Sequence, residues 1–480
     1  MTPSRGILIN GIEGPALSGD TFDVRAPETG QVIATVAAGQ SAEIDRAVIA
    51  GVEGFKVWSR LAGRERERIL LRAADLIEEQ GLSRLLDLLI DESGSTITKA
   101  KHEIAYTPDL LRAAAGEARR LMGDTFPNDR ADRLSFVVRE PVGIVGVLSP
   151  YNAPLSLLTK MTAFALAAGN AVVIKPSEET PVIALEYGRF LLEAGLPAGA
   201  IGIVPGLGPS TGMALVEHPL IDALALTGAT TTGRLVAMAA AKRLKRVQLE
   251  LGGKNALVVL GDFDPDQAAQ IACSGIFTHS GQICMANSRI IVEAAAYDAF
   301  CSAFKARADA LFLGDLRDPN TIYGPLINAR ALEKVVAQKD EALSRGAGLL
   351  AGGCVVRGLV YAPTILTEPD RASAAWRDES FGPICSVVRA HTFQDAISLA
   401  NDSDYGLSAG ILTHDVTKAF SAARQIKAGS VHIGMHPFQS NAMAPIGGYR
   451  DSGIGRSGGK YSVEEFTELK WISLEAPDGP

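Results

Sequence analysis

Residues 171–205 read AVVIKPSEETPVIALEYGRFLLEAGLPAGAIGIVP, and this stretch decides the fold class. The apolar runs 171–175 and 201–205 have the length of strands, and a helical pattern lies between them near 181–194. A strand, a helix of ten or more residues and a second strand are typical of a parallel β-α-β unit. The stretch therefore predicts a parallel sheet with helices packed on it.

The same alternation continues in both directions along the chain. Upstream, GIVGVLS at 143–149 is followed by a helical stretch at 155–168. Downstream come further expected helices and strands: a helix near 209–217, a strand at 222–228, a helix near 230–241 and the apolar runs 246–251 and 256–260. We expect a doubly wound sheet with helices on both faces.

The second half alternates less regularly and predicts a second α/β domain. The expected strands are 288–293, 385–390, 409–412 and 430–433. The expected helices are 265–277, 296–309, 329–345 and 415–426. Segment 132–141 alternates like an exposed strand, which suggests a projecting arm.

Composition indicates a water-soluble globular protein rather than a nucleic-acid binder. The 480 residues are 47% apolar and 21% charged, and the formal net charge is −8. A phosphate-backbone binder would be basic, so no nucleic-acid partner is expected. No apolar run reaches the ~18 residues that span a bilayer, so no membrane partner is expected. The start of the chain lacks a secretory pattern and the five cysteines form no C-x-x-C, so we expect a cytoplasmic protein.

Small or polar residues follow all five predicted strands of the first sheet. They occupy positions 150–154, 175–178, 206–209, 227–230 and 250–253. Ligands of open α/β sheets bind outside the carboxyl ends of the strands. The pattern predicts a cleft lined by an amide, an ammonium group, two carboxylates and free backbone N–H groups.

Each of these signals also has a plainer interpretation. Gly206-x-Gly208 is not G-x-G-x-x-G and by itself is more often a turn. Thr227-Gly228 either cradles a phosphate or only caps a helix. Lys175 would ordinarily be solvated, and Glu250 could be held in an ion pair rather than act as a base.

Cys284 is the one cysteine singled out, because it follows the small and flexible residues of Ser280-Gly281-Gln282. Free cysteines are usually buried hydrophobes, so the residue is a nucleophile or simply part of a core. His432 and His436 are spaced like metal ligands on a helix, but Gly434 and Pro437 argue against a helix there. No metal site is predicted.

Seven motifs in order resemble those of the NAD(P)-dependent aldehyde dehydrogenase superfamily over nearly the whole chain. They are SPYNAPL (149–155), VIKPSEETP (173–181), LTGATTTG (226–233), LELGGKNA (249–256), GQIC (281–284), ESFGPICSV (379–387) and PIGGYRDSGIGR (445–456). The gap of 34 residues from Glu250 to Cys284 is also similar to the family's usual spacing.

The resemblance implies three catalytic residues. The Cys284 thiolate would attack the aldehyde to give a thiohemiacetal, which the Asn152 amide and the Cys284 N–H would stabilise. After hydride transfer to the nicotinamide, Glu250 would activate water to hydrolyse the thioester.

The resemblance also implies a dinucleotide site. Its expected residues are Pro150, Tyr151, Lys175, Glu178, Gly208, Gly228, Ala229, Thr230, Gly252, Glu379 and Phe381. A carboxylate at position 178 accepts hydrogen bonds from a free ribose 2′-OH and repels a 2′-phosphate, so NAD is expected in preference to NADP.

Three positions depart from the family pattern. Tyr151 replaces a common Trp, Ala229 replaces a common Ser, and 430–434 differs from a segment that often ends in Asn.

The substrate prediction depends on a few apolar side chains rather than on a motif. Ile283, Met285, Leu157 and Phe438 favour an apolar tunnel, and hence an uncharged aromatic or medium-chain aldehyde. The rival functions are a CoA-acylating enzyme, which Glu250 opposes, and a non-catalytic relative. A papain-like hydrolase would need a histidine beside Cys284, and His279 carries no such signature.

The resemblance implies a three-part architecture. The expected parts are a dinucleotide-binding domain (1–118 and 142–251), a catalytic domain (252–458) and a small β arm for oligomerisation (119–141 and 459–480). The arm implies a homodimer or a homotetramer.

Overall fold

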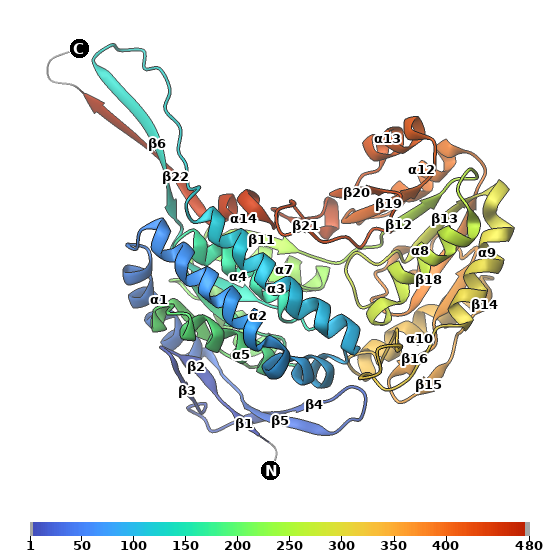
Figure 1. Ribbon diagram of the computed structural model, residues 1–480, viewed down its shortest axis with the longest axis horizontal. Helices are drawn as coiled ribbons and strands as arrows, with labels where there is room; N and C mark the ends of the chain where they lie inside the picture. The colour runs from blue at the N-terminus through green and yellow to red at the C-terminus, as the bar shows by residue number, and fades with distance from the viewer. Residues whose placement is uncertain (1–2, 476–480) are drawn as a thin grey trace.

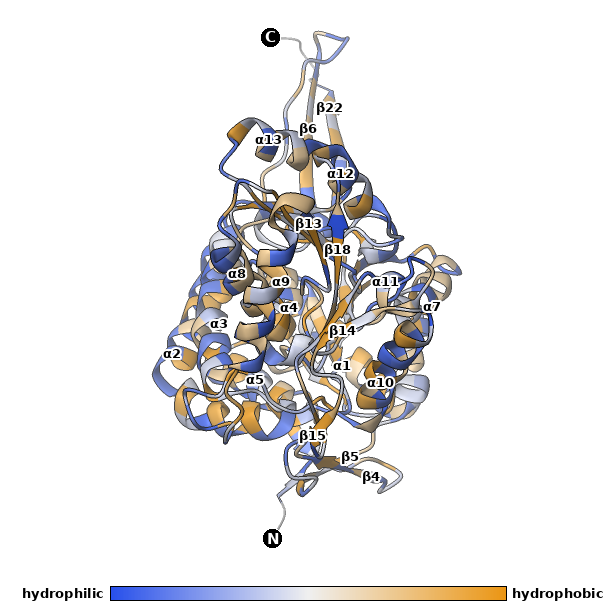
Figure 2. Cartoon of the chain, turned by 90° about the vertical axis from the view of Figure 1, so that its right-hand side faces the viewer, coloured by the Kyte–Doolittle hydropathy of each residue, from blue (hydrophilic) through white to orange (hydrophobic). Residues whose placement is uncertain are grey.

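The computed structural model describes residues 3–475. Figure 1 shows two α/β lobes and a two-stranded arm that projects away from the first lobe. Figure 2 shows that hydrophobic residues concentrate in the central strands, while the outer helices carry both hydrophobic and hydrophilic residues. Within residues 3–475, no helix combines the length and the apolar character that a membrane crossing requires.

The first lobe contains an eight-stranded sheet with a parallel centre. Its strands run in the order β21 (Gly453–Ile454), β11 (Arg246–Glu250), β10 (Ala223–Thr227), β7 (Ile144–Leu148), β8 (Ala171–Lys175), β9 (Ile201–Ile203), β2 (Ile7–Ile9) and β3 (Ile12–Gly14). The parallel part starts at β7 in the middle, adds β8 and β9 on one side, and then adds β10 and β11 on the other, while β2 and β3 from the start of the chain form the edge beside β9. The strand order therefore reverses between β7 and β10.

Helices cover both faces of this sheet, as expected for a doubly wound fold. One face packs against α2 (Gly63–Ser93), α3 (Ile97–Glu117), α4 (Ser156–Ala167) and α5 (Pro181–Glu193). The other packs against α1 (Ser41–Trp58), α6 (Met213–Glu217) and α7 (Thr230–Ala241). Successive residues of β7 point to opposite faces, since Val145 belongs to the first core and Ile144 to the second.

The α3 helix fixes the start of α4. The Glu103 carboxylate accepts hydrogen bonds from the N–H groups of Leu155 and Ser156, both at 2.9 Å. These N–H groups have no partner inside α4, and a carboxylate also suits the positive end of a helix. The cap anchors the segment 150–154 that leads from β7 into α4.

The second lobe contains a seven-stranded sheet in the order β14 (Gly348–Ala351), β17 (Thr364–Thr367), β18 (Ile384–Ala390), β13 (Arg289–Glu293), β12 (Ala256–Val259), β19 (Ser408–Leu412) and β20 (Ser430–Ile433). One face packs against α8 (Pro265–Phe277) and α9 (Ala294–Asp309). The other packs against α12 (Phe393–Asn401) and α13 (Val416–Gln425). The expected second α/β unit is therefore present.

The smaller elements complete the two lobes. Near the N-terminus lies a three-stranded sheet of β1 (Ser4–Arg5), β5 (Val32–Ala37) and β4 (Thr21–Arg25). The second lobe also carries α10 (Ala329–Ser344), α11 (Ala374–Arg377) and a hairpin of β15 (Val355–Arg357) and β16 (Val360–Tyr361).

The arm consists of β6 (Arg133–Pro141) and β22 (Thr467–Glu475), which pair antiparallel over their whole length. Residues 1–2 and 476–480, which the sequence prediction assigned to the first domain and the arm, lie outside the described residues. Two segments pack elsewhere than the sequence suggested: α14 (Gly459–Glu465) contacts α3 and α4, and β21 joins the first sheet beside β11. The chain thus returns from the second lobe to the first before it enters the arm.

Candidate active site

The carboxyl ends of β7, β8, β10 and β11, together with Gly208 in the segment after β9, border one cavity of about 450 Å³. The cavity lies at the point where the strand order reverses, which is where open α/β sheets bind ligands. Of the eleven predicted dinucleotide residues, ten line it: Pro150, Tyr151, Lys175, Glu178, Gly208, Gly228, Ala229, Gly252, Glu379 and Phe381. The sequence-based interpretation of the strand ends is therefore consistent with the geometry.

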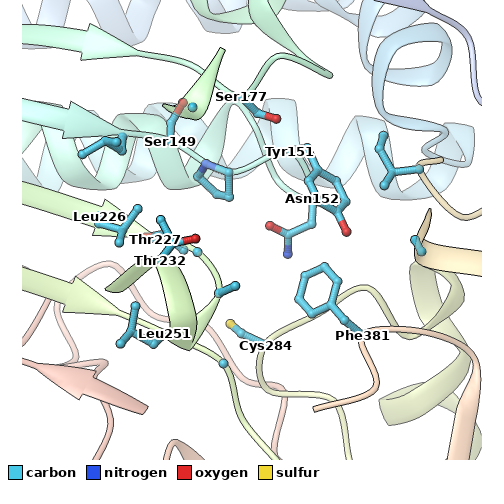
Figure 3. A pocket seen from close by; sticks show the side chains of 18 of the residues that line it. Ser149, Tyr151, Asn152, Ser177, Leu226, Thr227, Thr232, Leu251, Cys284 and Phe381 are labelled. Atoms are coloured by element: carbon cyan, nitrogen blue, oxygen red, sulfur yellow. The ribbon is translucent and has the colours of Figure 1, made fainter. Parts of the chain in front are cut away.

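Thr230 is the exception among the predicted cofactor residues. Its hydroxyl donates to the Asp451 carbonyl at 3.0 Å, so its side chain is directed toward β21 rather than into the cavity. Thr232, two residues further along α7, lines the cavity instead (Figure 3). The difference arises because residues at the start of a helix point in successive directions about 100° apart.

The start of α7 provides a place for an anionic group. Ala229 is the N-cap residue and no side chain caps this helix end. The first N–H groups of a helix have no intrahelical partner and carry partial positive charge. A Cβ atom on Gly208 would meet no atom within 4 Å, so that segment leaves open space opposite the helix. The arrangement fits a pyrophosphate.

Lys175 and Glu178 form an ion pair at the end of β8, with 2.9 Å between Nζ and Oε2. Burial opposes ionisation of Glu178, but the Lys175 ammonium outweighs it and lowers the pKa of this carboxyl. An ionised carboxylate beside a buried ammonium fits the two hydroxyls of a ribose, since one side chain accepts and the other donates.

Glu379 and Phe381 reach the same cavity from the second lobe. The N–H of Gly253 donates to Glu379 Oε1 at 3.1 Å, and burial raises the pKa of this carboxyl. Phe381 has a positive φ of 51°, which turns its ring across the cavity. The ring meets that of Tyr151 edge to face at 5.8 Å. The two rings form an apolar wall of the cavity, and a flat heteroaromatic ring such as nicotinamide fits against such a wall.

Cys284 is carried by a turn that follows an unusual backbone segment. His279, Ser280 and Gly281 have φ values of 50°, 54° and 69°, so three consecutive residues are left-handed. Gln282 is fully buried and fixes the segment, because its Oε1 accepts the Ile327 N–H at 2.9 Å. Strained backbone of this kind persists only where surrounding contacts hold it, and it concentrates at functional sites.

The Asn152 side chain joins the two lobes at Cys284. Its Nδ2 donates to the Gln282 carbonyl at 2.9 Å, two residues before the cysteine. A primary amide has two N–H groups, so one remains for a ligand. Figure 3 shows the Asn152 amide and the Cys284 thiol near the same opening, with Phe381 beside them.

Glu250 ends β11 and is buried beside Cys284. Its Oε1 is buried without a hydrogen-bond partner. Burial raises the pKa of Glu250, and the charges of Lys160 and Arg456 offset part of that rise. The pKa of Cys284 is also raised, to about 12, by burial and by the negative charges of Glu250 and Glu379. Both shifts favour the protonated forms, so the Cys284 thiol lies next to a base of raised pKa.

A second cavity of about 400 Å³ lies on the other side of these groups. Its walls include Leu157, Ile283, Met285 and Phe438, the four side chains from which the sequence predicted an apolar tunnel. Among residues 3–475, only three residues border both this cavity and the first one: Asn152, Glu250 and Cys284. The three predicted catalytic residues thus stand between a dinucleotide-sized cleft and a largely apolar tunnel.

Several lining residues were not predicted from the sequence. Ser149, Ser177 and Thr232 lie inside the motifs 149–155, 173–181 and 226–233, but the sequence analysis gave them no role. Arg330 and Lys334 reach the first cavity from α10. No motif marks them, because their position depends on how the second lobe packs against the first.

Comparisons with known proteins agree with this geometry. The family model described as the aldehyde dehydrogenase family matches residues 16–472. The chain is 36% identical to vanillin dehydrogenase of Pseudomonas fluorescens over 99% of this chain and 98% of that protein. It is 36% identical to the mitochondrial succinate-semialdehyde dehydrogenase of Arabidopsis thaliana, over 97% of this chain and 88% of that protein.

Solved structures give the same result. The crystal structure of an NAD-dependent aldehyde dehydrogenase from Sinorhizobium meliloti is similar to this one with a TM-score of 0.97 and 34% identity. The match covers 100% of this chain and 96% of the other. On fold, site geometry and sequence together, the chain belongs to the aldehyde dehydrogenase family.

Proposed function

We propose that the protein oxidises an uncharged aromatic or medium-chain aldehyde to the carboxylate with NAD. The observation that carries this proposal is that Asn152, Glu250 and Cys284 alone, among the described residues, border both cavities. An aldehyde in the tunnel would meet the thiol on one side and the cofactor on the other. Proximity of this kind turns a bimolecular reaction into an effectively intramolecular one.

Each catalytic side chain has a separate role in the proposed reaction. The Cys284 thiol transfers its proton to a base, for which Glu250 is the adjacent group, and the sulfur attacks the aldehyde carbon to give a thiohemiacetal. The free N–H of Asn152 and the backbone N–H of Cys284 stabilise its oxygen. The nicotinamide, when bound, supplies the hydride acceptor. Glu250 releases the thiol proton to solvent and then, ionised again, takes a proton from water, which hydrolyses the resulting Cys284 thioester.

The residues of the first cavity support NAD rather than NADP. The ionised Glu178 accepts hydrogen bonds from a 2′-OH and repels a 2′-phosphate at the same place. Steady-state kinetics with each cofactor test this preference. A higher kcat/KM with NADP than with NAD would contradict it.

The tunnel supports an uncharged substrate rather than a carboxylated semialdehyde. In the described part of the chain its lining contains no arginine. Lys99 is paired with Glu103, with 2.5 Å between Nζ and Oε2, and Lys160 lies next to Glu250. A carboxylate tail would therefore find no guanidinium group and an ammonium of Lys99 that is already paired. Burial lowers the pKa of Lys160, which weakens it as a charged partner, so desolvation of the tail would be costly.

A panel of aldehydes tests the substrate proposal. We expect kcat/KM to be highest for benzaldehyde, vanillin or octanal, and at least tenfold lower for succinate semialdehyde. A preference for the semialdehyde would contradict the proposal.

Addition of CoA distinguishes hydrolysis from acyl transfer. Formation of acyl-CoA at a rate above that of the carboxylate would favour the CoA-acylating alternative.

We also propose that the arm joins two copies of the chain, as a homodimer or a homotetramer. The arm exposes Leu469, Trp471 and Leu474 on a strand with an open edge, and such edges invite pairing. Light scattering tests this, and a monomer at micromolar concentration would contradict it.

The five cysteines are free thiols, which supports a cytoplasmic location.

A further inference from the structure

Residues 250–255 connect the two sheets, include Glu250, and contact both Glu379 and the turn that carries Cys284. Glu250 ends β11, and β12 begins directly after Asn255. Between them, the Gly253 N–H holds Glu379, and Lys254 Nζ donates to Ser380 Oγ at 2.9 Å. The packing is close, because a Cβ atom on Gly253 would lie 2.6 Å from the Cys284 carbonyl oxygen.

Asn255 is the member of this segment that contacts the nucleophile turn. Its Nδ2 donates to the carbonyls of Cys284 and Ala286, at 2.8 and 3.0 Å. Its Oδ1 accepts the Ser408 N–H at 3.0 Å. The side chain is 3% exposed, and its two N–H groups and its oxygen all have partners. The backbone of Asn255 is held as well, since its carbonyl accepts the Arg289 N–H.

The contacts fix the backbone on both sides of Cys284. The turn around it is closed by a hydrogen bond from the Ala286 N–H to the Ile283 carbonyl at 3.0 Å. Asn152 holds the carbonyl that precedes this turn, and Asn255 holds two carbonyls within it. A side chain anchored in the sheet of the second lobe therefore sets the direction of the sulfur and of the Cys284 N–H.

We propose that Asn255 is a positioning residue for Cys284, which aligns the thiol and its N–H with the aldehyde oxygen. The proposal rests on the proposed function, because it gives Asn255 a role in thiohemiacetal formation. An amide suits the position, since it supplies two donors on one nitrogen and an acceptor beside it. A carboxylate would present negative oxygens to two carbonyl oxygens, and alanine would leave both carbonyls without a donor.

The test compares Asn255→Ala and Asn255→Asp with a matched control, Asn287→Ala. Asn287 is fully buried in the same loop, but its Nδ2 donates to the Ala272 carbonyl of α8 at 3.1 Å. Each replacement removes buried hydrogen bonding, so each should lower the melting temperature. Of these two asparagines, only Asn255 donates to carbonyls of the turn that carries Cys284.

We expect kcat of the Asn255 variants to fall about 100-fold, which is the effect of a misplacement of about 1 Å. The KM for NAD should stay within about twofold, because Lys175 and Glu178 are untouched. Alkylation of Cys284 by iodoacetamide should move to higher pH, because its own N–H, which lowers its pKa, is no longer held in place. The charged groups facing the thiol, Glu250, Glu379 and Lys160, are the same in Asn255→Ala, whereas Asn255→Asp adds a carboxylate of its own, so the alkylation profile is interpreted on Asn255→Ala.

Asn287→Ala should keep kcat and the alkylation profile of the wild type, per folded molecule. An Asn255→Ala protein with wild-type kcat and alkylation would overturn the proposal, as would equal losses in Asn287→Ala. If Asn255→Ala does not fold, Asn255→Ser retains one donor and should show an intermediate loss. Alkylation requires neither cofactor nor turnover, so its result stands even if the proposed function fails.

Discussion

Replacement of Asn152 by alanine tests whether this amide stabilises charge on the substrate oxygen. Asn152 is 6% exposed and borders both cavities. One N–H of its Nδ2 is used by the Gln282 carbonyl, and the other is free. Loss of one donor of this kind typically costs 10²–10³ in kcat, or about 2.7–4 kcal/mol. We expect the same loss for Asn152→Ala.

The same replacement also has a predictable cost in stability. The Gln282 carbonyl would lose its partner while buried, which costs about 1–3 kcal/mol. Asn170→Ala is the matched control: Asn170 is fully buried in the same lobe, and its Nδ2 donates to the Ala165 and Phe466 carbonyls, outside both cavities. The control should lose stability but keep kcat.

The assay is the rate of NADH formation at saturating aldehyde and NAD, with the melting temperature measured in parallel. A kcat for Asn152→Ala within tenfold of the wild type would refute the reasoning. So would an equal loss of kcat in Asn170→Ala, because the effect would then come from destabilisation of the lobe.

Three further outcomes are expected. Glu178→Gln should raise the ratio of kcat/KM for NADP over NAD by about tenfold, since it removes a charge that repels a 2′-phosphate; an unchanged ratio would exclude Glu178 from the ribose site. Because burial raises the pKa of Glu250, and a base acts only when ionised, kcat should fall as pH falls through a value above the 4.5 of an ordinary glutamate. This fall of kcat at low pH should be absent from the residual activity of Glu250→Gln. If it persists there, the titrating group is not Glu250. Leu157→Arg should favour succinate semialdehyde over benzaldehyde by at least tenfold in relative kcat/KM, and no change would place the substrate elsewhere.

The parallel sheet could be predicted because its signal is local. The strand 171–175 and the helix 265–277 have the bounds that the sequence predicted, because turn or polar residues stand at the ends of each segment. The α3 helix was not predicted. It contains Pro108, which lacks the N–H that a helix interior needs, yet it forms because its apolar face packs against α2 and α4.

The candidate site could be predicted as far as the motifs extended. Glu250 and Cys284 lie 34 residues apart in the sequence and at one place in the structure, which spacing alone does not establish. Thr230 was assigned from its motif, but the rotation of the first helical turn brings Thr232 to the cavity. Asn255 lies inside the motif LELGGKNA (249–256), but the motif indicates no role for it, because its partners come from three different strands or loops.

The most direct test of the central claim is mass spectrometry of Glu250→Gln after mixing with NAD and benzaldehyde. Without a base to activate water, hydrolysis should stall after hydride transfer. We predict one equivalent of NADH per subunit, formed more slowly than in the wild type because the Cys284 thiol has also lost its adjacent base, and a benzoyl group on the peptide that contains Cys284. Continued linear NADH formation with an unmodified Cys284 would contradict the account.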